Sequence, residues 1–204
     1  MTKIIDYYFT PVSPWAYLGH RRLLAIASAA GAVVDPKPVD YGRIFPLSGG
    51  LPLKQRAAQR QAYRFMELRR WRAHLGVPLN LEPRHFPVDA TLASRMLVAA
   101  RTEGAPAALA LAGAMLSACW AEEGNLADEG TLAALAQGVG LDGAALLAAA
   151  RGEAAASSYA ALTDEAIARN VFGAPTYAFG GEIFWGQDRL DFLERALAAA
   201  GPAA

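Results

Sequence analysis

The sequence predicts an α/β fold in which a small sheet carries a large all-helical insertion. Three observations support this prediction. A strand, a helix and a second strand follow one another in residues 1–40, helical periodicity fills most of residues 53–162, and two short strands precede a final helix. A chain of 204 residues is long enough to bury one core and still hold such an insertion.

The first forty residues have the pattern of a βαβ unit. Residues 4–9 are an apolar, β-rich run, and Pro14 suits the first turn of the helix that follows. Gly31 ends that helix, and residues 33–39 form a second strand whose two prolines predict an edge position. The turn between strand and helix presents Ser13 at the carboxyl end of the first strand, where open α/β sheets bind their ligands.

The middle of the chain predicts a loop and then a block of helices. Glycine and proline crowd residues 41–52, which indicates the loop. Leucine, methionine and tryptophan then recur at helical spacing, and the predicted helices cover residues 55–75, 90–101, 106–123, 131–137 and 142–151. Thr163-Asp164-Glu165 is typical of a further helix start, because it places acidic residues in a first turn.

The last part of the chain returns to strands. Residues 173–185 predict a hairpin with Gly180-Gly181 at its turn, and a helix with inward-facing leucines follows. The order βαβ, helical block, ββα is that of a thioredoxin-like sheet with a helical insertion. We therefore expect residues 1–40 and 163–204 to form a thioredoxin-like domain, and residues 41–162 to form a helical insertion subdomain.

Charge and cysteine content indicate which binding partners and which cellular location to expect. The formal net charge is +0, with 19 basic and 19 acidic residues, which argues against a nucleic-acid partner and against a membrane surface. Cys119 is the only cysteine, so no intrachain disulfide can form. No apolar run has the length of a signal peptide or of a membrane helix, and no grouping of histidine, cysteine and aspartate has metal-ligand spacing. We expect a cytoplasmic protein with a small-molecule partner and no metal.

Ser13 occupies the position where a redox cysteine would be expected, between an apolar strand and a helix start. A serine cannot form a disulfide, but its hydroxyl can donate a hydrogen bond to the thiolate of another molecule within the positive field of the helix end. The natural intracellular candidate for that thiol is glutathione. The alternative is that Ser13 only caps its helix. His20 lies about 10 Å further along the same helix, too far to act as a base for Ser13.

Three motifs carry a family resemblance over nearly the whole chain. They are Ser13-Pro14-Trp15-Ala16-Tyr17-Leu18, Gly173-Ala174-Pro175-Thr176 and Phe184-Trp185-Gly186-Gln187-Asp188-Arg189-Leu190, with Gly42-Arg43-Ile44-Phe45 and Leu53-Lys54-Gln55-Arg56 as weaker support. In order and separation they resemble the 2-hydroxychromene-2-carboxylate isomerases and the related kappa-class glutathione transferases. The resemblance implies a DsbA/kappa-type thioredoxin fold, and it implies a homodimer.

The resemblance also implies a glutathione site. Ser13 would stabilise the glutathione thiolate, and a cis peptide bond at Ala174-Pro175 would offer backbone groups to the bound tripeptide. Main-chain N–H groups in Trp185-Gly186-Gln187 would receive a carboxylate, while Asp188 would pair with the γ-glutamyl ammonium group. The alternatives are an ordinary turn proline and an acidic residue that only interacts with the helix dipole.

For the organic substrate, the resemblance points to a second set of residues. Gln55 and Arg56 match family positions that contact this substrate, and a guanidinium there suits a carboxylate. The family often has a lysine near the position of Phe45, and Lys54 is the nearby residue that could replace it. Other arginines of the 55–75 helix, among them Arg60 and Arg64, are interpreted as a mostly solvated face.

The predicted function is that of a glutathione-dependent cis–trans isomerase acting on an aromatic or conjugated carboxylate. The glutathione thiolate would add transiently to the substrate, and elimination after bond rotation would return it. Two alternatives stay open. A kappa-like glutathione transferase would release the conjugate, and a redox-inactive peptide-binding module on the same scaffold would bind glutathione weakly. The sequence argues against a disulfide oxidoreductase, because no second cysteine lies near Ser13 to complete a dithiol.

Overall fold

The computed structural model describes residues 2–201. Its sheet contains β1 (Lys3–Phe9), β2 (Ala32–Pro38), β3 (Thr176–Phe179) and β4 (Glu182–Trp185). The helices are α1 (Pro14–Ala29), α2 (Tyr41–Ser48), α3 (Ala58–Leu75), α4 (Thr91–Ala100), α5 (Ala105–Ala121), α6 (Glu129–Gly138), α7 (Gly143–Arg151), α8 (Glu153–Ala168) and α9 (Leu190–Ala199). Short 3-10 helices lie at η1 (Leu53–Gln55), η2 (Arg101–Glu103) and η3 (Gln187–Arg189).

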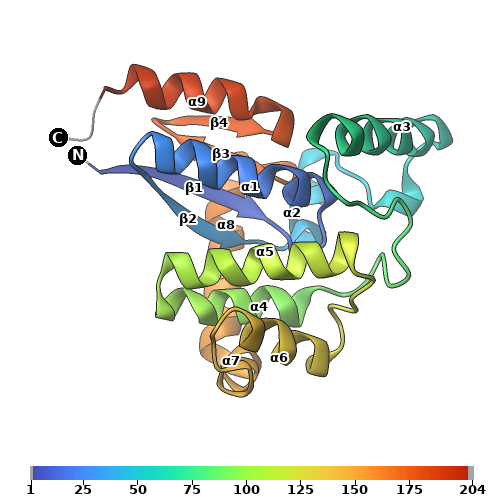
Figure 1. Cartoon of the computed structure of the whole chain (residues 1–204), viewed down its shortest axis with the longest axis vertical. Helices are drawn as coiled ribbons and strands as arrows, with labels where there is room; N and C mark the ends of the chain where they lie inside the picture. Colours follow the sequence, from blue (N-terminus) through green and yellow to red (C-terminus); the bar gives the residue numbers. More distant parts are fainter. Residues whose placement is uncertain (1, 202–204) are drawn as a thin grey trace.

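The strands form one mixed sheet in the order β2-β1-β3-β4. β1 is parallel to β2 and antiparallel to β3, and β3 pairs with β4 in a hairpin whose turn glycines, Gly180 and Gly181, have φ values of 61° and 87°. Figure 1 shows α1 in front of the sheet, α8 behind it, and α3 standing apart at the right. The predicted α/β fold, the edge position of β2 and the hairpin are confirmed.

The second half of the central strand β1 is buried on both faces of the sheet, which explains the apolar run Tyr7-Tyr8-Phe9. Tyr7 and Phe9 stack at 4.3 Å within the larger core, which also takes in α1, α5 and α9. Tyr8 points to the opposite face and packs with Val39 and Ile44 in a smaller core against α8. Helices α4 to α7 therefore share the larger core with the sheet, whereas α2 packs in the smaller one. Among residues 2–201, no helix has both the length and the apolar character that crossing a membrane requires.

Two sequence predictions about helices were wrong. Residues 41–52 are not all loop, because α2 covers Tyr41–Ser48. Its N-cap is Asp40, whose carboxylate accepts the N–H of Gly42 at 2.8 Å, and its C-cap is Gly49, with a φ of 72°. Thr163 does not start a helix, because α8 begins ten residues earlier, at Glu153. The Thr163 hydroxyl is buried, donates to the carbonyl of Tyr159 and accepts the N–H of Asp40. The boundary expected at residue 162 falls inside α8.

A buried histidine couples stability to pH. His20 is 5% exposed, and its Nε2 lies 3.1 Å from the carbonyl oxygen of Leu109. Its Nδ1 has no hydrogen-bond partner among residues 2–201. Burial lowers the pKa of His20 from 6.5 to about 4, so the folded protein holds a neutral ring that donates from Nε2.

We expect the free energy of unfolding to fall by about 2 kcal/mol between pH 7 and pH 5 through His20 alone. The sign follows from the lowered pKa, because the unfolded chain binds a proton below pH 6.5 that the folded protein takes up only near pH 4. Urea unfolding at both pH values measures the effect. His20→Gln should lose correspondingly less stability over the interval, and an equal loss in the two proteins would contradict the assignment.

Candidate functional site

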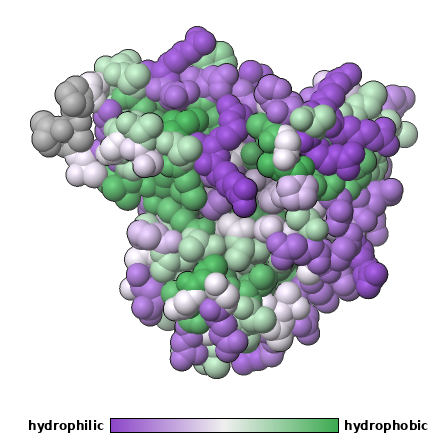
Figure 2. All heavy atoms as spheres, in the orientation of Figure 1, coloured by the Kyte–Doolittle hydropathy of each residue, from purple (hydrophilic) through white to green (hydrophobic). Residues whose placement is uncertain are grey.

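Two adjoining cavities lie where the start of α1, the helices α2 and α3, and the segment from residue 172 to residue 189 meet. The first, of about 560 Å³, contains Ser13 and is called the serine cavity here. The second, of about 530 Å³, contains Asp188 and is called the Asp188 cavity. They share a wall made by Trp15, Arg56, Arg60, Arg64, Ala174 and Trp185. Figure 2 shows hydrophilic residues covering much of α3, which contributes Arg60 and Arg64 to this wall.

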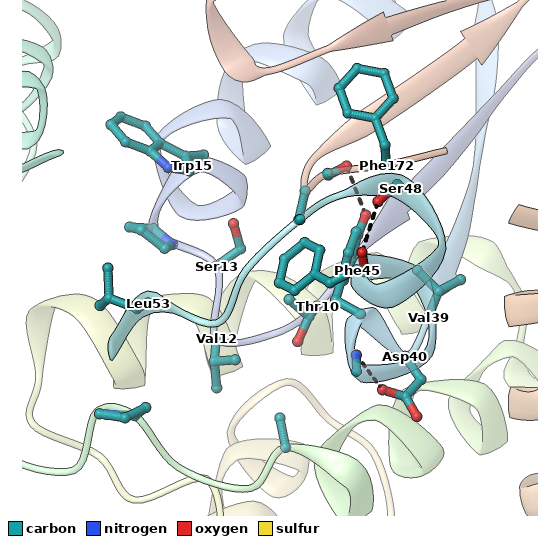
Figure 3. Close-up of a pocket in the computed structure, with 18 of the residues that line it drawn as sticks. Thr10, Val12, Ser13, Trp15, Val39, Asp40, Phe45, Ser48, Leu53 and Phe172 are labelled. Atoms are coloured by element: carbon teal, nitrogen blue, oxygen red, sulfur yellow. Dashed lines mark hydrogen bonds between the residues drawn. The ribbon is translucent and has the colours of Figure 1, made fainter. Parts of the chain in front are cut away.

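Ser13 begins α1 and faces the serine cavity. Its backbone is extended, with φ −82° and ψ 121°, and its Oγ accepts the N–H of Ala16 at 3.2 Å. Ser13 therefore caps α1, as the alternative interpretation expected. The cap uses a lone pair of Oγ and leaves the hydroxyl hydrogen free to donate to a ligand. Figure 3 shows this hydroxyl directed into the space between Trp15 and Phe45, so capping and ligand binding are compatible.

Aromatic side chains line much of the serine cavity. Phe45 comes from α2, Phe172 precedes β3, and Phe86 lies in the segment between α3 and α4. Gly50 lets the chain turn back over Phe45, because a Cβ at this position would lie 2.5 Å from the phenyl ring. Flat aromatic walls suit an aromatic or conjugated ligand, and the same cavity also contains polar and charged side chains such as Ser13 and Arg56.

The main chain of Ala174 borders both cavities. The Ala174–Pro175 peptide bond is cis, as the resemblance implied. Tyr41 donates to the carbonyl of Gly173 at 2.9 Å, and the carbonyl of Pro175 accepts the N–H of Gly186 at 2.8 Å. These bonds hold the residues on either side of Ala174. Within residues 2–201, the N–H and carbonyl of Ala174 itself make no hydrogen bond, which leaves them available to a ligand's backbone.

Trp185 forms an exposed part of the shared wall. Its indole ring packs against Phe172 at 4.7 Å and is half exposed. A Cβ at Gly173 would lie 2.2 Å from the Trp185 indole nitrogen, so glycine is required there for this close packing. The predicted contact residue Trp185 thus lines both cavities, whereas Pro175 lines neither and acts through its carbonyl.

The segment from Gly186 to Asp188 supplies polar groups to the Asp188 cavity. Gly186 has a φ of 100°, and its N–H is already used by Pro175, so it cannot receive a carboxylate. Gln187 is buried, and its side-chain oxygen accepts a hydrogen bond from Arg22 of α1. The Asp188 carboxylate is partly exposed and lies 3.4 Å from the guanidinium of Arg189. Asp188 therefore offers the accessible negative charge at this end of the cavity.

The predicted substrate residues are brought together only in part. Phe45 and Arg56 both line the serine cavity, with the guanidinium of Arg56 6.0 Å from the phenyl ring. Arg56 also donates from Nε to the carbonyl of Leu51 at 2.8 Å, which orients its side chain. Lys54 and Gln55 are exposed and do not line either cavity. Burial and then the neighbouring Arg60 lower the pKa of Arg56.

The interpretation of the α3 arginines as a solvated face was wrong for Arg64. Arg60 and Arg64 lie one turn apart on α3, Arg56 lies just before that helix, and all three line the shared wall. Arg64 is buried, unlike exposed Arg60. Spacing alone could have linked Arg64 to Arg56. The aromatic residues Trp15, Phe86 and Phe172 were not predicted as cavity residues, because two of them lie in irregular segments whose path has no sequence signal.

The remaining reactive groups do not enter the site. Cys119 is buried in α5, and burial followed by the charge of Glu123 raises its pKa to about 12, so it is an unreactive thiol. Among residues 2–201, no group of three histidine, cysteine, aspartate or glutamate side chains could hold a metal ion. The cavities offer three kinds of interaction. The Ser13 hydroxyl can donate a hydrogen bond, the arginines of the shared wall can bind an anionic group, and Asp188 can bind a cationic group.

Comparisons with known proteins agree with this architecture. Residues 4–198 match the family model of the DSBA-like thioredoxin domain. The 2-hydroxychromene-2-carboxylate isomerase of Sphingobium xenophagum is 33% identical over 198 residues, which cover 97% of this chain and 99% of that protein. The enzyme of the same name from Pseudomonas putida is 33% identical over 197 residues, covering 95% of this chain and 94% of that protein.

Solved structures agree as well. A 2-hydroxychromene-2-carboxylate isomerase matches with a TM-score of 0.79 and 30% identity, covering 97% of this chain and 95% of that chain. A probable DsbA oxidoreductase from Streptomyces coelicolor shares the fold, with a TM-score of 0.78 at 20% identity and coverage of 97% and 89%. The class is therefore a DsbA-like thioredoxin fold, as the sequence predicted. Within that class, the chain belongs to the 2-hydroxychromene-2-carboxylate isomerase family.

Proposed function

We propose that this protein is a glutathione-dependent cis–trans isomerase of an aromatic or conjugated carboxylate. The observation that carries the proposal is the Ser13 hydroxyl, a free donor at the N-terminus of α1 that opens into an aromatic cavity. The relatives are named isomerases, which supports the reaction type. The absence of a second cysteine from the sequence leaves no dithiol for disulfide exchange.

The residues of the Asp188 cavity fit glutathione by charge and by hydrogen bonding. Glutathione carries one ammonium group, two carboxylates, main-chain amides and a thiol. Asp188 can pair with the ammonium group, and Arg60 at the cavity rim can pair with a carboxylate. The free backbone groups of Ala174 can bind the amides beside the cysteine. The thiol would then reach the junction of the two cavities, towards Ser13.

When bound, glutathione would supply a thiolate that adds to a conjugated carbon, permits rotation about the adjoining bond, and leaves unchanged. Ser13 would donate its hydroxyl hydrogen to the sulfur, and the partial positive charge at the start of α1 would favour the ionised form. Arg56 would hold the substrate at the cavity entrance. The aromatic walls would exclude water and align the conjugated plane of the substrate with the sulfur.

Asp188→Asn is expected to weaken glutathione binding by about tenfold, because the ammonium group loses its charged partner. Isothermal titration calorimetry with reduced glutathione measures the dissociation constant. Glu194→Gln is the matched control, since it removes an exposed charge from the neighbouring helix α9 and should leave the constant unchanged. No heat from millimolar glutathione with the wild-type protein would reject the proposal, and equal constants for both variants would remove Asp188 from the site.

The concentration of free glutathione during turnover distinguishes an isomerase from a transferase. An isomerase leaves the concentration of free glutathione unchanged during turnover, whereas a kappa-like transferase consumes one molecule for each substrate. Thiol titration with Ellman's reagent during turnover makes this measurement. A cytoplasmic location, where thiols are kept reduced, and a homodimeric state belong to the same proposal.

A further inference from the structure

Arg64 places a buried guanidinium in the wall that the two cavities share. The residue is 8% exposed, and its Nη2 atom has no hydrogen-bond partner among residues 2–201. Burial and then the charge of Arg56 lower its pKa to about 10, so the group stays charged at neutral pH. A buried charge without a counter-ion is unfavourable, and an anionic ligand in either cavity would relieve that cost.

The surroundings of Arg64 are aromatic. Its guanidinium carbon lies 5.6 Å from the ring centres of both Phe86 and Trp120 and 5.7 Å from that of Phe65. Phe86 and Trp120 also pack against each other at 4.7 Å. Rings at this distance attract and orient a guanidinium, but they do not accept its strong hydrogen bonds as a carboxylate does. The group is therefore held in place with hydrogen-bonding capacity left over.

The Trp120 ring connects Arg64 with the turn that carries Ser13. The indole nitrogen of Trp120 donates to the carbonyl of Val12 at 3.3 Å, and Val12 directly precedes Ser13 in the wall of the serine cavity. Arg64 is thus packed on the residue that supports the turn carrying the hydroxyl donor. Arg60, one helical turn away, is exposed at the rim. Of the three arginines that line both cavities, Arg64 is the buried one, on the side of the aromatic walls.

We propose that Arg64 is a specificity-determining residue that binds the carboxylate of the organic substrate at the inner end of the serine cavity. The inference rests on the proposed function for the class of substrate, but it assigns the carboxylate to a residue with no role in that proposal. The planar fork of Arg64 can bind a carboxylate through two hydrogen bonds. A carboxylate of glutathione offers the same chemistry, so the experiment separates the two sources.

The test uses trans-cinnamate as the probe, with uncharged trans-cinnamamide as its matched partner, and it is performed without glutathione. Isothermal titration calorimetry compares the wild type with Arg64→Met, Arg64→Lys and the control Arg69→Met, whose side chain is exposed on the same helix. Arg64→Met should weaken cinnamate binding by about tenfold or more. Cinnamamide binding should change by less than about twofold, because it has no charge to lose. Arg69→Met should leave both constants unchanged.

Two measurements exclude misfolding of Arg64→Met as the cause of weaker binding. Arg64→Met should melt at the same temperature as the wild type or higher, because it removes an unpaired buried charge. Should this variant fold poorly, Arg64→Lys makes the same test, since it keeps the charge, loses the planar fork and should bind cinnamate with intermediate affinity.

The inference is overturned if Arg64→Met binds cinnamate as tightly as the wild type does. A separate titration with reduced glutathione makes the second comparison: the inference is overturned if the variant loses affinity for glutathione and not for cinnamate, because the carboxylate would then be that of the tripeptide. A wild-type protein that binds no glutathione, yet shows the cinnamate difference, would reject the proposed function and support the role of Arg64.

Discussion

Replacing Ser13 with alanine should lower kcat/KM for glutathione-dependent isomerisation by between about 100-fold and 1,000-fold, the effect of removing one positioned donor to a developing anion. The substrate for the assay is 2-hydroxychromene-2-carboxylate, after which the relatives are named. The ultraviolet absorbance of bound thiolate gives the apparent pKa of the glutathione sulfur. This pKa should rise in the variant, and an unchanged value would remove Ser13 from the mechanism.

Ser13 caps α1 and is also the proposed donor to the thiolate, so the experiment must separate the effects of losing these two roles. Alanine also removes the cap of α1, which costs about 1 kcal/mol. Ser13→Gly is the better variant here, since glycine at an N-cap costs only a few tenths of a kcal/mol and still lacks the hydroxyl. Ser48→Ala is the matched control within the same cavity. Its hydroxyl donates to Ile44 at 3.1 Å, so the rate should stay within about twofold.

Lys37→Met should lower the free energy of unfolding by about 1–2 kcal/mol at pH 7, because two partly buried carboxylates lose the buried cation that they share and keep only the exposed Arg169. Lys37 is 7% exposed, and its Nζ lies 2.9 Å from Asp6 and 2.7 Å from Glu165. Tyr8 donates to the same Glu165 oxygen at 2.7 Å. The group ties β1 and β2 to α8, so urea unfolding should report a global loss. Lys54→Met, at an exposed lysine, is the control and should change little.

The loss of unfolding free energy in Lys37→Met should depend on pH. Burial alone would raise the pKa of Glu165, but hydrogen bonds from Lys37 and Tyr8 outweigh it and hold the pKa below its ordinary value of 4.5. A carboxylate with a lowered pKa stabilises the folded protein above pH 4.5, and that contribution is lost as the pH falls. The difference between wild type and Lys37→Met should therefore shrink below pH 4.5. A difference that stays constant from pH 5 to about pH 3 would contradict this account.

The parts of the fold that the sequence predicted are those set by local periodicity. The apolar run of β1, the proline at the start of α1 and the two turn glycines of the hairpin each specify one local conformation. Local sequence also predicted the position of Ser13, because a strand-to-helix turn presents its residues at the carboxyl end of the strand. Ser13, Ala174, Trp185 and Asp188 were named for the site, and the structure places them around the two cavities.

The errors arose where distant contacts override local signals. α2 forms despite Pro46 and the glycines around it, because its Asp40 cap and the packing of Ile44 against the smaller core stabilise it. Thr163 resembles a helix start, yet its hydroxyl binds the carbonyl one turn earlier inside α8. Arg64 has the same local sequence character as the exposed arginines of α3. Phe86 and Trp120, from other parts of the chain, pack against its guanidinium, and these distant contacts leave no signal in the sequence around Arg64.

The hydrogen bond from Trp120 to Val12 also limits how a protein of this architecture can diversify. Trp120 belongs to α5, and Val12 belongs to the turn that carries Ser13, so the helical block and this turn share a structural support. A changed helical block would alter both the shape of the serine cavity and the position of the Ser13 hydroxyl. These two features are therefore coupled, and an engineer who exchanges the helical block should expect to restore the turn as well.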